Sequence, residues 1–388
     1  MAEFKDTGAD RGMGVPPRAA SCGMRPTGVP PVELQGRDGP ATHGQDARAT
    51  TGPAEFKRVV VTGGMGFIGS NYVRLALRLH PQWQIVVLDK LPYAGNRDNL
   101  ADVMDRITFV HGDVAETDDA TKAMNGADAV VHFAAESHVD RSLIDSRPFV
   151  RTNVEGTLVL LDTARKVGLK RFLHVSTDEV YGDLAGTDIH SVETDLLRPR
   201  SPYAATKAAA EHVVFSYGIS FGLDVVVTRG SNTYGPYQYP EKVIPLFITN
   251  AIEDKPLPLY GDGSAVRDYL HAEDHAAGID TVLHRGQGGQ AYNLGARLEV
   301  CGVEVADRIL RCLNKPASLK KFVTDRPGHD YRYSVDPTKA EALGWTRQWT
   351  WQDGLDKTVQ WYVQNERWWR AVKQRMEFRQ HEKTWYSR

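Results

Sequence analysis

The strongest constraint on the fold is a turn of regularly spaced glycines that directly follows a short apolar run. Residues 58–62 read Arg-Val-Val-Val-Thr, and Gly63, Gly66 and Gly69 then open a helical stretch that continues to about Leu79. The β-branched run predicts a buried parallel strand. Residues without a Cβ let the turn bend sharply and approach a pyrophosphate, which then faces the positive end of the helix. Taken alone, such a triplet indicates no more than a tight strand-to-helix turn.

A second predicted strand ends in an acid at the position that a dinucleotide site requires. This strand covers residues 84–89, and Asp89 lies 20 residues beyond Gly69. A carboxylate at this point binds the ribose hydroxyls of adenosine. Because it repels a 2′-phosphate, Asp89 favours NAD over NADP, although Lys90 and Arg97 nearby weaken that preference.

Strands and helices continue to alternate as far as about residue 230. Further strands are predicted at residues 107–110, 129–134, 170–176 and 223–229, with helical segments between them that include residues 145–167. This order predicts an α/β fold with a doubly wound, parallel Rossmann-type sheet, whose ligands lie at the carboxyl ends of the strands. Beyond residue 230 the alternation loosens and prolines cluster, which favours a smaller, mixed C-terminal substrate-binding domain.

Composition sets the expected domain boundaries. Residues 1–57 hold nine Gly and seven Pro, so we expect a disordered or dispensable N-terminal extension. Residues 58–230 form the expected NAD-binding Rossmann domain, which also receives part of residues 265–290. Residues 231–388 mainly form the second domain. Near its end, the capping pattern at residues 350–353 predicts a helix to about Val372. Its tryptophans, Trp361, Trp368 and Trp369, could form a binding surface, but core and helix packing is favoured.

Charge and cysteine content narrow the class of protein. The 47 basic residues nearly balance the 49 acidic ones, so no global field attracts nucleic acid or an acidic membrane. No apolar run reaches the ~20 residues of a membrane span. Three cysteines are too few and too irregularly spaced for a disulfide framework or a zinc site, so we expect no metal and a reducing cytoplasm.

Two groups of residues suggest acid–base chemistry. Thr177, Asp178 and Glu179 follow the predicted fifth strand, and Tyr203 stands four residues before Lys207 in a predicted helix. The four-residue spacing places the phenol and the ammonium on one helical face, where the ammonium is expected to lower the tyrosine's pKa. Such a tyrosine can take a proton from a sugar hydroxyl. In isolation, both groups are also common on solvated surfaces.

With these motifs in place, the sequence resembles the extended short-chain dehydrogenase/reductases, and among them the dTDP-glucose 4,6-dehydratases. The resemblance runs from about Arg58 to about Trp369. The glycine turn and the Tyr203/Lys207 pair are shared across the superfamily, whereas the Thr-Asp-Glu triplet and residues 136–142 are much more specific. The matching stretches are residues 62–70, 89–95, 134–142, 176–182, 201–207, 234–242, 266–268 and 325–330.

The resemblance implies a reaction that removes water from a nucleoside-diphosphate glucose and regenerates NAD within one turnover. Tyr203 would take the proton of the 4-hydroxyl, and Thr177 would hydrogen-bond that hydroxyl. Glu179 would remove the proton from carbon 5, and Asp178 would protonate the departing 6-hydroxyl. Lys207 would bind the nicotinamide ribose.

The resemblance also implies two sets of contacts and an assembly. We expect a homodimer formed through the helix that carries Tyr203 and the preceding helix at residues 145–167. The implied cofactor contacts are Gly63, Gly66, Phe67, Ile68, Gly69, Asp89, Lys90, Asp113, Val114, Ala134, Ala135, Thr152, Tyr203 and Lys207. The implied substrate contacts are Ser137, Thr177, Asn232, Lys242, Val243, Pro258, Leu259, Tyr260, Arg267, Asn293, Arg326, His329 and Asp330.

The sequence departs from the family pattern at two positions, and it leaves several alternative functions open. Thr233 replaces the second Asn of the family's Asn-Asn-Tyr, and Pro92 replaces a common threonine. A UDP-sugar 4-epimerase or UDP-glucuronate decarboxylase uses the same tyrosine and NAD, but it needs no acid such as Asp178 to expel a hydroxyl. A non-catalytic NAD- or nucleotide-sugar-binding module is the alternative of another class. The sequence leaves the choice between thymidine and uridine open, as it does the pathway.

Overall fold

The computed structural model describes residues 55–325, 330–376 and 378. Nearly all of the expected N-terminal extension therefore lies outside the described residues, and the description concerns the compact unit Thr50–Arg388. The packed part begins slightly before residue 58. Phe56 is buried against Trp83, and the backbone N–H groups of Lys57 and Arg58 donate to the carboxylate of Asp128.

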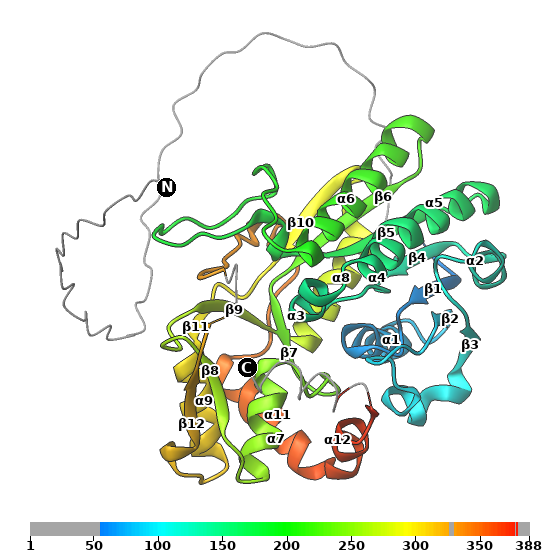
Figure 1. Ribbon diagram of the computed structural model, residues 1–388. Coiled ribbons are helices and arrows are strands. Elements are labelled where there is room, and N and C mark those ends of the chain that lie inside the picture. Colours follow the sequence, from blue (N-terminus) through cyan, green and yellow to red (C-terminus); the bar gives the residue numbers. More distant parts are fainter. Residues whose placement is uncertain (1–54, 326–329, 377, 379–388) are drawn as a thin grey trace, which may run out of the picture. The chain divides into compact units, whose positions relative to one another are not determined.

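A sheet of seven parallel strands forms the centre of this unit, as the sequence predicted (Figure 1). Its spatial order is β10-β6-β5-β4-β1-β2-β3, so β1 lies beside both β2 and β4. The seventh strand, β10, was not predicted and pairs with β6 at the edge of the sheet. The strands are β1 (Arg58–Thr62), β2 (Gln84–Asp89), β3 (Ile107–His111), β4 (Ala129–His132), β5 (Arg171–Thr177), β6 (Val225–Gly230) and β10 (Gln290–Leu294).

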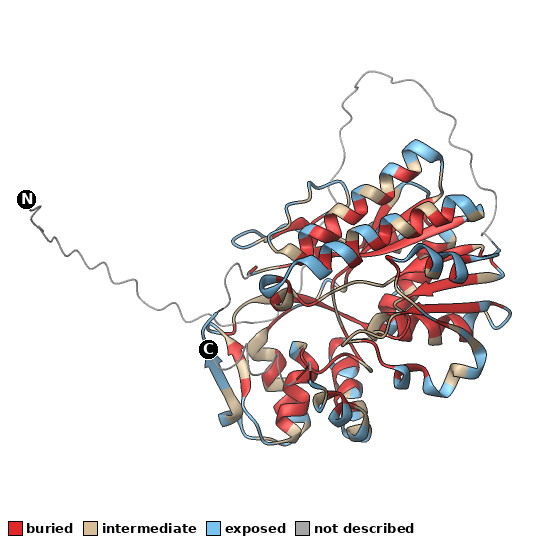
Figure 2. Cartoon of the chain, turned by 45° about the vertical axis from the view of Figure 1, so that its right-hand side comes forward, coloured by how far each residue is buried: buried red, intermediate tan, exposed pale blue. Residues whose placement is uncertain are grey.

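Helices cover both faces of this sheet. Val59 and Val61 of β1 belong to the core beneath α1 and α8, whereas Val60 belongs to the core beneath α2, α5 and α6. Both faces of the strand are buried, which explains its uninterrupted apolar run. Figure 2 shows the strands of the large sheet mostly in red, the colour of buried residues. The helices are α1 (Phe67–Leu79) and α8 (Ala272–Arg285) on one face, and α2 (Thr117–Met124), α5 (Gly156–Val167) and α6 (Pro202–Phe221) on the other.

A second, smaller core lies among the elements that follow β6. Leu259, Leu355 and Trp369 are among its buried residues, and the burial of Trp369 confirms packing rather than surface binding for that aromatic side chain. The strands here are β7 (Asn232–Tyr234), β9 (Val266–His271) and β11 (Glu299–Cys301) in one sheet, and β8 (Leu257–Tyr260) and β12 (Lys320–Val323) in another. The helices are α7 (Val243–Ile252), α9 (Gly302–Cys312), α10 (Thr338–Glu341), α11 (Trp351–Gln364) and α12 (Glu366–Lys373).

Two predicted helices are interrupted in the structure. The segment at residues 145–167 consists of α4 (Arg147–Phe149), a π-helical turn at Val150–Glu155, and α5. Within the π-turn, Asn153 accepts the backbone N–H of Glu136 at 2.8 Å and donates to Thr206 at 2.9 Å. The π-turn thus joins the loop after β4 to α6, which a continuous α-helix predicted from periodicity does not reveal.

The C-terminal aromatic segment was predicted as one helix from Thr350 to about Val372. Instead, α11 ends at Asn365, whose φ of −114° lies outside the helical range, and α12 starts directly afterwards. The remaining short helices are α3 (Val139–Ile144), η1 (Arg97–Arg106), η3 (Asp178–Tyr181) and η4 (Ala317–Leu319). Among the described residues, no helix is long and apolar enough to cross a membrane.

The chain crosses between the two groups of elements more than once. After β7, α7, β8 and β9, it returns to the large sheet as α8 and β10, and α8 packs against α1. The large sheet and its helices thus draw on residues before and after 231. A division into two domains near residue 230 stays a prediction.

Candidate active site

A pocket opens where the large sheet's strands end at their carboxyl termini, and it collects most of the predicted site residues. All five expected catalytic residues line it: Thr177, Asp178, Glu179, Tyr203 and Lys207. The expected cofactor residues that line it are Gly63, Gly66, Phe67, Ile68, Gly69, Asp89, Lys90, Val114, Ala134, Ala135 and Thr152. Of the expected substrate residues, Ser137, Thr177, Asn232 and Lys242 line it.

The glycine turn is held by close backbone approaches. Gly63 has a φ of +68°, and a Cβ there would lie 2.6 Å from the backbone nitrogen of Ala134. A Cβ on Gly69 would lie 2.4 Å from the carbonyl oxygen of Gly63. Helix α1 begins directly after Gly66, so its N-terminal N–H groups lie at the pocket. An anion is favoured at this point.

Asp89 closes the turn from the end of β2. Its carboxylate accepts the backbone N–H of Met65 at 3.0 Å and that of Leu91 at 2.8 Å. Burial raises its pKa, and the two hydrogen bonds and Lys90 act in the opposite direction. A carboxylate oxygen has more than one lone pair, so Asp89 retains acceptor capacity for ribose hydroxyls.

Lys90 stands in an acidic group at the rim. Its ammonium donates to Thr152 at 3.1 Å and lies 3.8 Å from Asp113 and 3.9 Å from Glu136. Asp113 itself does not line the pocket. The positive charge that made the cofactor preference ambiguous in the sequence is thus partly neutralised.

Asp178 and Glu179 form the first residues of η3, directly after β5. The Thr177 hydroxyl accepts the N–H of Glu179 at 3.3 Å and donates to Asp178 at 3.2 Å. Burial, and then repulsion by Glu179 and Asp268, raises the pKa of Asp178 well above its usual range. Burial thus favours the protonated form of the Asp178 carboxyl, beside a second acid.

Tyr203 and Lys207 enter the pocket from the first two turns of α6. Pro202 starts this helix and Ser201 caps it by accepting the N–H of Ala204 at 3.1 Å. Lys207 donates to the carbonyl of Val175 at 2.7 Å and contacts Nε2 of His174 at 3.3 Å. Burial lowers the pKa of Lys207 to about 8, although Glu211 raises it.

The expected lowering of the Tyr203 pKa by Lys207 is wrong for this structure. Burial, followed by the charge of Glu179, raises the pKa of Tyr203 far above its ordinary value, and a hydrogen bond with Thr177 offsets only part of this. The spacing of four residues correctly placed both groups in the pocket. It carried no information about the two acids that follow β5, whose charges also raise the pKa of the phenol.

Several buried polar atoms of the pocket lack hydrogen-bond partners among the residues that the structure describes. Leaving such an atom unpaired costs roughly 1–3 kcal/mol, so a cluster of them indicates a bound polar ligand. Together with the glycine cradle and Asp89, these atoms fit a dinucleotide and a polar co-substrate. They are Ser176 Oγ, Asp178 Oδ2, Ser231 Oγ, Asn232 Oδ1, Gln238 Oε1 and His275 Nε2.

Other expected substrate contacts are not brought into the pocket. Asn293 is fully buried in β10, where it accepts the Tyr181 hydroxyl at 2.7 Å and donates to the carbonyl of Ser191 at 2.9 Å. Leu259 is part of the smaller core, and the pocket lining does not include Val243, Pro258 or Tyr260. Arg326 and His329 lie outside the described residues.

Arg267 and Asp330 lie behind the two acids rather than in the pocket wall. Arg267 donates to the carbonyl of Asp330 at 2.8 Å and lies over the Tyr333 ring. The Tyr333 hydroxyl donates to Asp330, and the charge of Arg267 opposes the rise in the pKa of Asp178. Arg267 thus influences the pKa of Asp178.

The pocket also contains residues that the sequence analysis did not assign to it. Glu241 is buried and pairs with Arg141 at 2.9 Å, while Tyr93 lies under the same guanidinium. Glu241 directly precedes Lys242, an expected substrate contact, so its position in the sequence could have indicated that it lies in the pocket. Thr233 donates or accepts a 2.7 Å hydrogen bond with Nδ1 of His275, so the threonine that replaces the family's Asn has a specific partner.

The fold and the pocket define a dinucleotide-dependent enzyme of the short-chain dehydrogenase/reductase type. The sequence model of the GDP-mannose 4,6 dehydratase family matches residues 60–358. The chain therefore belongs to this family of nucleotide-sugar 4,6-dehydratases, as the resemblance predicted.

Similar proteins agree with this assignment. A dTDP-glucose 4,6-dehydratase of Streptomyces niveus is 46% identical over 81% of this chain and 96% of its own length. The trifunctional UDP-glucose 4,6-dehydratase RHM1 of Arabidopsis thaliana is 45% identical over 81% of this chain and 48% of its own. The crystal structure of the dTDP-glucose 4,6-dehydratase DesIV from Streptomyces venezuelae, with NAD bound, is 47% identical, covers 81% of this chain and 100% of its own, and has a TM-score of 0.79.

The contact between Lys207 and His174 predicts a pH dependence. An ammonium only donates, so Nε2 of His174 acts as the acceptor; burial, followed by Lys207, keeps the pKa of His174 well below its usual value. If catalysis requires protonated Lys207, kcat/KM falls as pH rises through about 8. His174→Leu removes an acceptor that stabilises the ammonium, so the alkaline limb of kcat/KM should move to lower pH.

The matched control is His174→Gln, which keeps a side-chain acceptor and should leave the limb near its wild-type position. Glu211 and Tyr203 also face this region and are unchanged in both variants. An alkaline limb at the same pH in the wild type and in His174→Leu would contradict the role of His174.

Proposed function

We propose that this protein is an NAD-dependent dTDP-glucose 4,6-dehydratase, which converts dTDP-glucose to dTDP-4-keto-6-deoxyglucose and water. Its membership of a 4,6-dehydratase family makes it a hydro-lyase, and relatives of the same family are named for this activity. NAD, when bound, accepts a hydride from carbon 4 of the sugar and returns it to carbon 6. The glycine turn and Asp89 are the groups that would hold its pyrophosphate and adenosine ribose.

One observation carries the dehydratase assignment: a buried carboxyl with a strongly raised pKa lies beside a second carboxyl, next to the tyrosine. Asp178 is 3% exposed, and its Oδ2 has no partner among the described residues. A protonated carboxyl can donate to a leaving hydroxyl, and a neighbouring ionised carboxylate can remove a carbon-bound proton. Dehydration requires both of these functions together.

The residues divide the proton transfers among themselves. Tyr203 takes the proton of the 4-hydroxyl, while Thr177 hydrogen-bonds the same hydroxyl. The ketone then acidifies carbon 5, whose proton passes to Glu179. Asp178 donates its proton to the 6-hydroxyl as the bond between carbon 6 and oxygen breaks, so that water leaves. Lys207, held by Val175 and His174, binds the nicotinamide ribose.

A 4-epimerase or a UDP-glucuronate decarboxylase would use the same tyrosine and cofactor. Neither reaction expels a hydroxyl from carbon 6, so neither explains why Asp178 is buried with a raised pKa next to Glu179. A binding module without catalysis would not need Tyr203 and Lys207 in the same pocket. These points favour dehydration over the three alternatives.

The two acids should fail in different ways when replaced. Glu179→Gln cannot remove the carbon-5 proton, so NADH and the 4-keto hexose should accumulate, without deuterium entering at carbon 5 from heavy water. Asp178→Asn retains the base, so exchange at carbon 5 should outrun water loss. Each change should slow product formation about 10²–10⁴-fold, measured by the alkaline absorbance of the 4-keto product.

Tyr203→Phe is the reference variant for this experiment, because it blocks the first oxidation and should give neither NADH nor exchange. Wild-type rates in both acid variants would refute the dehydratase proposal. If deuterium entered at carbon 5 in Glu179→Gln but not in Asp178→Asn, Asp178 would be the base and Glu179 the acid.

The choice of thymidine over uridine rests on a single methyl group. Burying it contributes roughly 0.8 kcal/mol, which corresponds to about a four-fold preference in kcat/KM. We expect dTDP-glucose to exceed UDP-glucose by about this factor when the two are compared under the same conditions. Equal or higher kcat/KM with UDP-glucose would assign the protein to uridine nucleotides, the base used by the Arabidopsis relative.

We further propose a homodimer formed through α5 and α6. Leu158 on α5 and Val150 in the preceding π-turn are exposed apolar residues, and Ala205 and Ala209 leave α6 without bulky side chains on its outer side. Helices with small residues approach each other closely.

Light scattering of the full chain should therefore give about twice the monomer mass of 43.1 kDa. Leu158→Arg places a charge in the proposed contact and should shift the mass toward the monomer. The control is Leu196→Arg, which changes an equally apolar, 73% exposed residue elsewhere. A monomeric wild type at micromolar concentration would contradict the proposal.

We place the reaction in the cytoplasm. Cys301 and Cys312 are both free thiols, which a reducing compartment preserves.

A further inference from the structure

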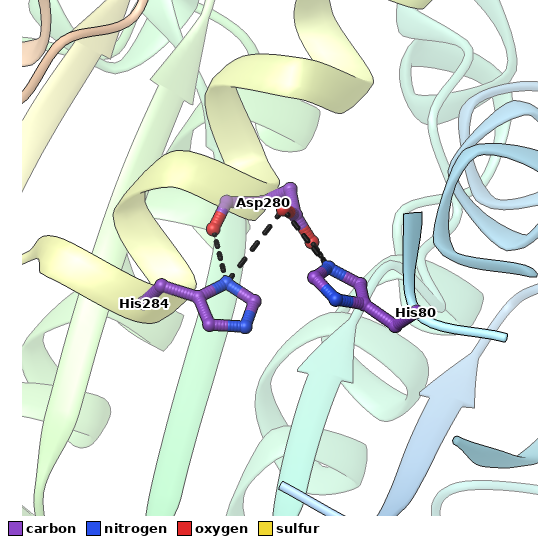
Figure 3. Close-up of side chains that lie close together, drawn as sticks. All are labelled: His80, Asp280 and His284. Carbon is purple, nitrogen blue, oxygen red and sulfur yellow. Dashed lines mark hydrogen bonds and ion pairs between the residues drawn. The ribbon is translucent and has the colours of Figure 1, made fainter. Parts of the chain in front are cut away.

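Two histidines and an aspartate meet where the C-terminal end of α1 packs against α8 (Figure 3). His80 is the residue that ends α1, whereas Asp280 and His284 lie one turn apart on α8. None of the three lines the active-site pocket. Helix α1 has 13 residues and places its other end at the pocket, so this cluster lies roughly 20 Å from the glycine turn.

The carboxylate of Asp280 lacks a permanent positive partner. Asp280 is 9% exposed, and no Lys or Arg among the described residues lies within ion-pairing distance of it. The polar groups beside it are the rings of His80 and His284 and the hydroxyl of Tyr72. A buried carboxylate without a Lys or Arg partner favours a cation beside it.

The separations between the three side chains match those of metal ligands. Oδ2 of Asp280 lies 3.2 Å from Nε2 of His80 and 3.6 Å from Nδ1 of His284. In a tetrahedral site with metal–ligand distances of about 2.0–2.1 Å, neighbouring ligand atoms lie roughly 3.4 Å apart. All three ligand atoms lie within 4.8 Å of one another, so only small side-chain movements are needed.

We propose that His80, Asp280 and His284 bind a divalent transition-metal ion, with Zn²⁺ as the best-fitting ion and water as the fourth ligand. Two imidazole nitrogens and one carboxylate oxygen suit Zn²⁺, whereas Ca²⁺ and Mg²⁺ prefer oxygen ligands only. The side chains of His80, Asp280 and His284 keep exposures of 18%, 13% and 17%, which leaves a path from solvent.

Bound metal would tie α1 to α8 on one face of the large sheet. Nδ1 of His284 donates to the backbone carbonyl of Asp280 at 2.8 Å, and metal binding would exchange this hydrogen bond for a metal bond. The site is structural, because it lies away from the reacting atoms. The proposal therefore does not depend on the identity of the substrate.

The test is equilibrium dialysis of the full, untagged chain against ZnCl₂ after treatment with a chelator, with bound zinc measured by mass spectrometry. About one zinc per chain is expected. Loss of an outer-shell partner already costs about 10–100-fold in metal affinity, so loss of a ligand in His80→Gln or His284→Gln should weaken binding at least that much. Both variants keep a polar side chain opposite Asp280.

The matched control is His212→Gln, at an exposed histidine of α6, which should bind zinc like the wild type. Zinc should also raise the thermal midpoint of the wild type but not that of His80→Gln. Excess CaCl₂ should not displace the bound zinc. Circular dichroism establishes that the variants are folded. Zinc binding that is absent in the wild type, or equal in the wild type and the His80 and His284 variants, would overturn the proposal.

Discussion

The structure depends on the close approach of two backbones at Gly63, where the end of β1 meets the loop after β4. A Cβ at this position would lie 2.6 Å from Ala134, and the φ of +68° is one that other residues rarely adopt. The turn brings the start of α1 to the edge of the sheet, and Asp89 fixes it there by accepting the N–H of Met65. The pocket opens directly beside this turn.

Burial then decides the chemistry of the groups that β5 and α6 contribute. It raises the pKa of Asp178 and Tyr203 and lowers that of Lys207, in each case because the charged form loses water. The same loss of water raises the pKa of an acid and lowers the pKa of a base. The directions of all three shifts follow from a single physical cause, adjusted by the neighbours Glu179, Asp268 and Glu211.

Buried polar groups with incomplete pairing mark two regions of the molecule. In the pocket, atoms such as Ser176 Oγ and His275 Nε2 lack partners, and a large polar ligand supplies them. At the junction of α1 and α8, Asp280 has two histidine partners but no Lys or Arg partner within the described part of the chain. The first pattern fits a substrate and cofactor that come and go, and the second fits an ion that strengthens the packing of two helices.

The amino-acid sequence by itself determined the local elements of the site. The apolar run before Gly63, the acid at Asp89, the Thr-Asp-Glu triplet and the Tyr203/Lys207 spacing are all local patterns, and local patterns specify strands, turns and helix faces. Six of the seven strands of the sheet were predicted for the same reason. The family followed from the order of these motifs.

Tertiary structure alone decided which distant groups meet. Strand β10 joins the sheet from beyond residue 285, and Asn293 within it is buried by Tyr181 and Ser191 rather than exposed to a nucleotide. The pKa of Tyr203 rises through burial and then through the charge of Glu179, which follows β5, and His80 lies beside Asp280 although 200 residues separate them. Burial and charge depend on all neighbours in space, and sequence spacing reports only those on the same element.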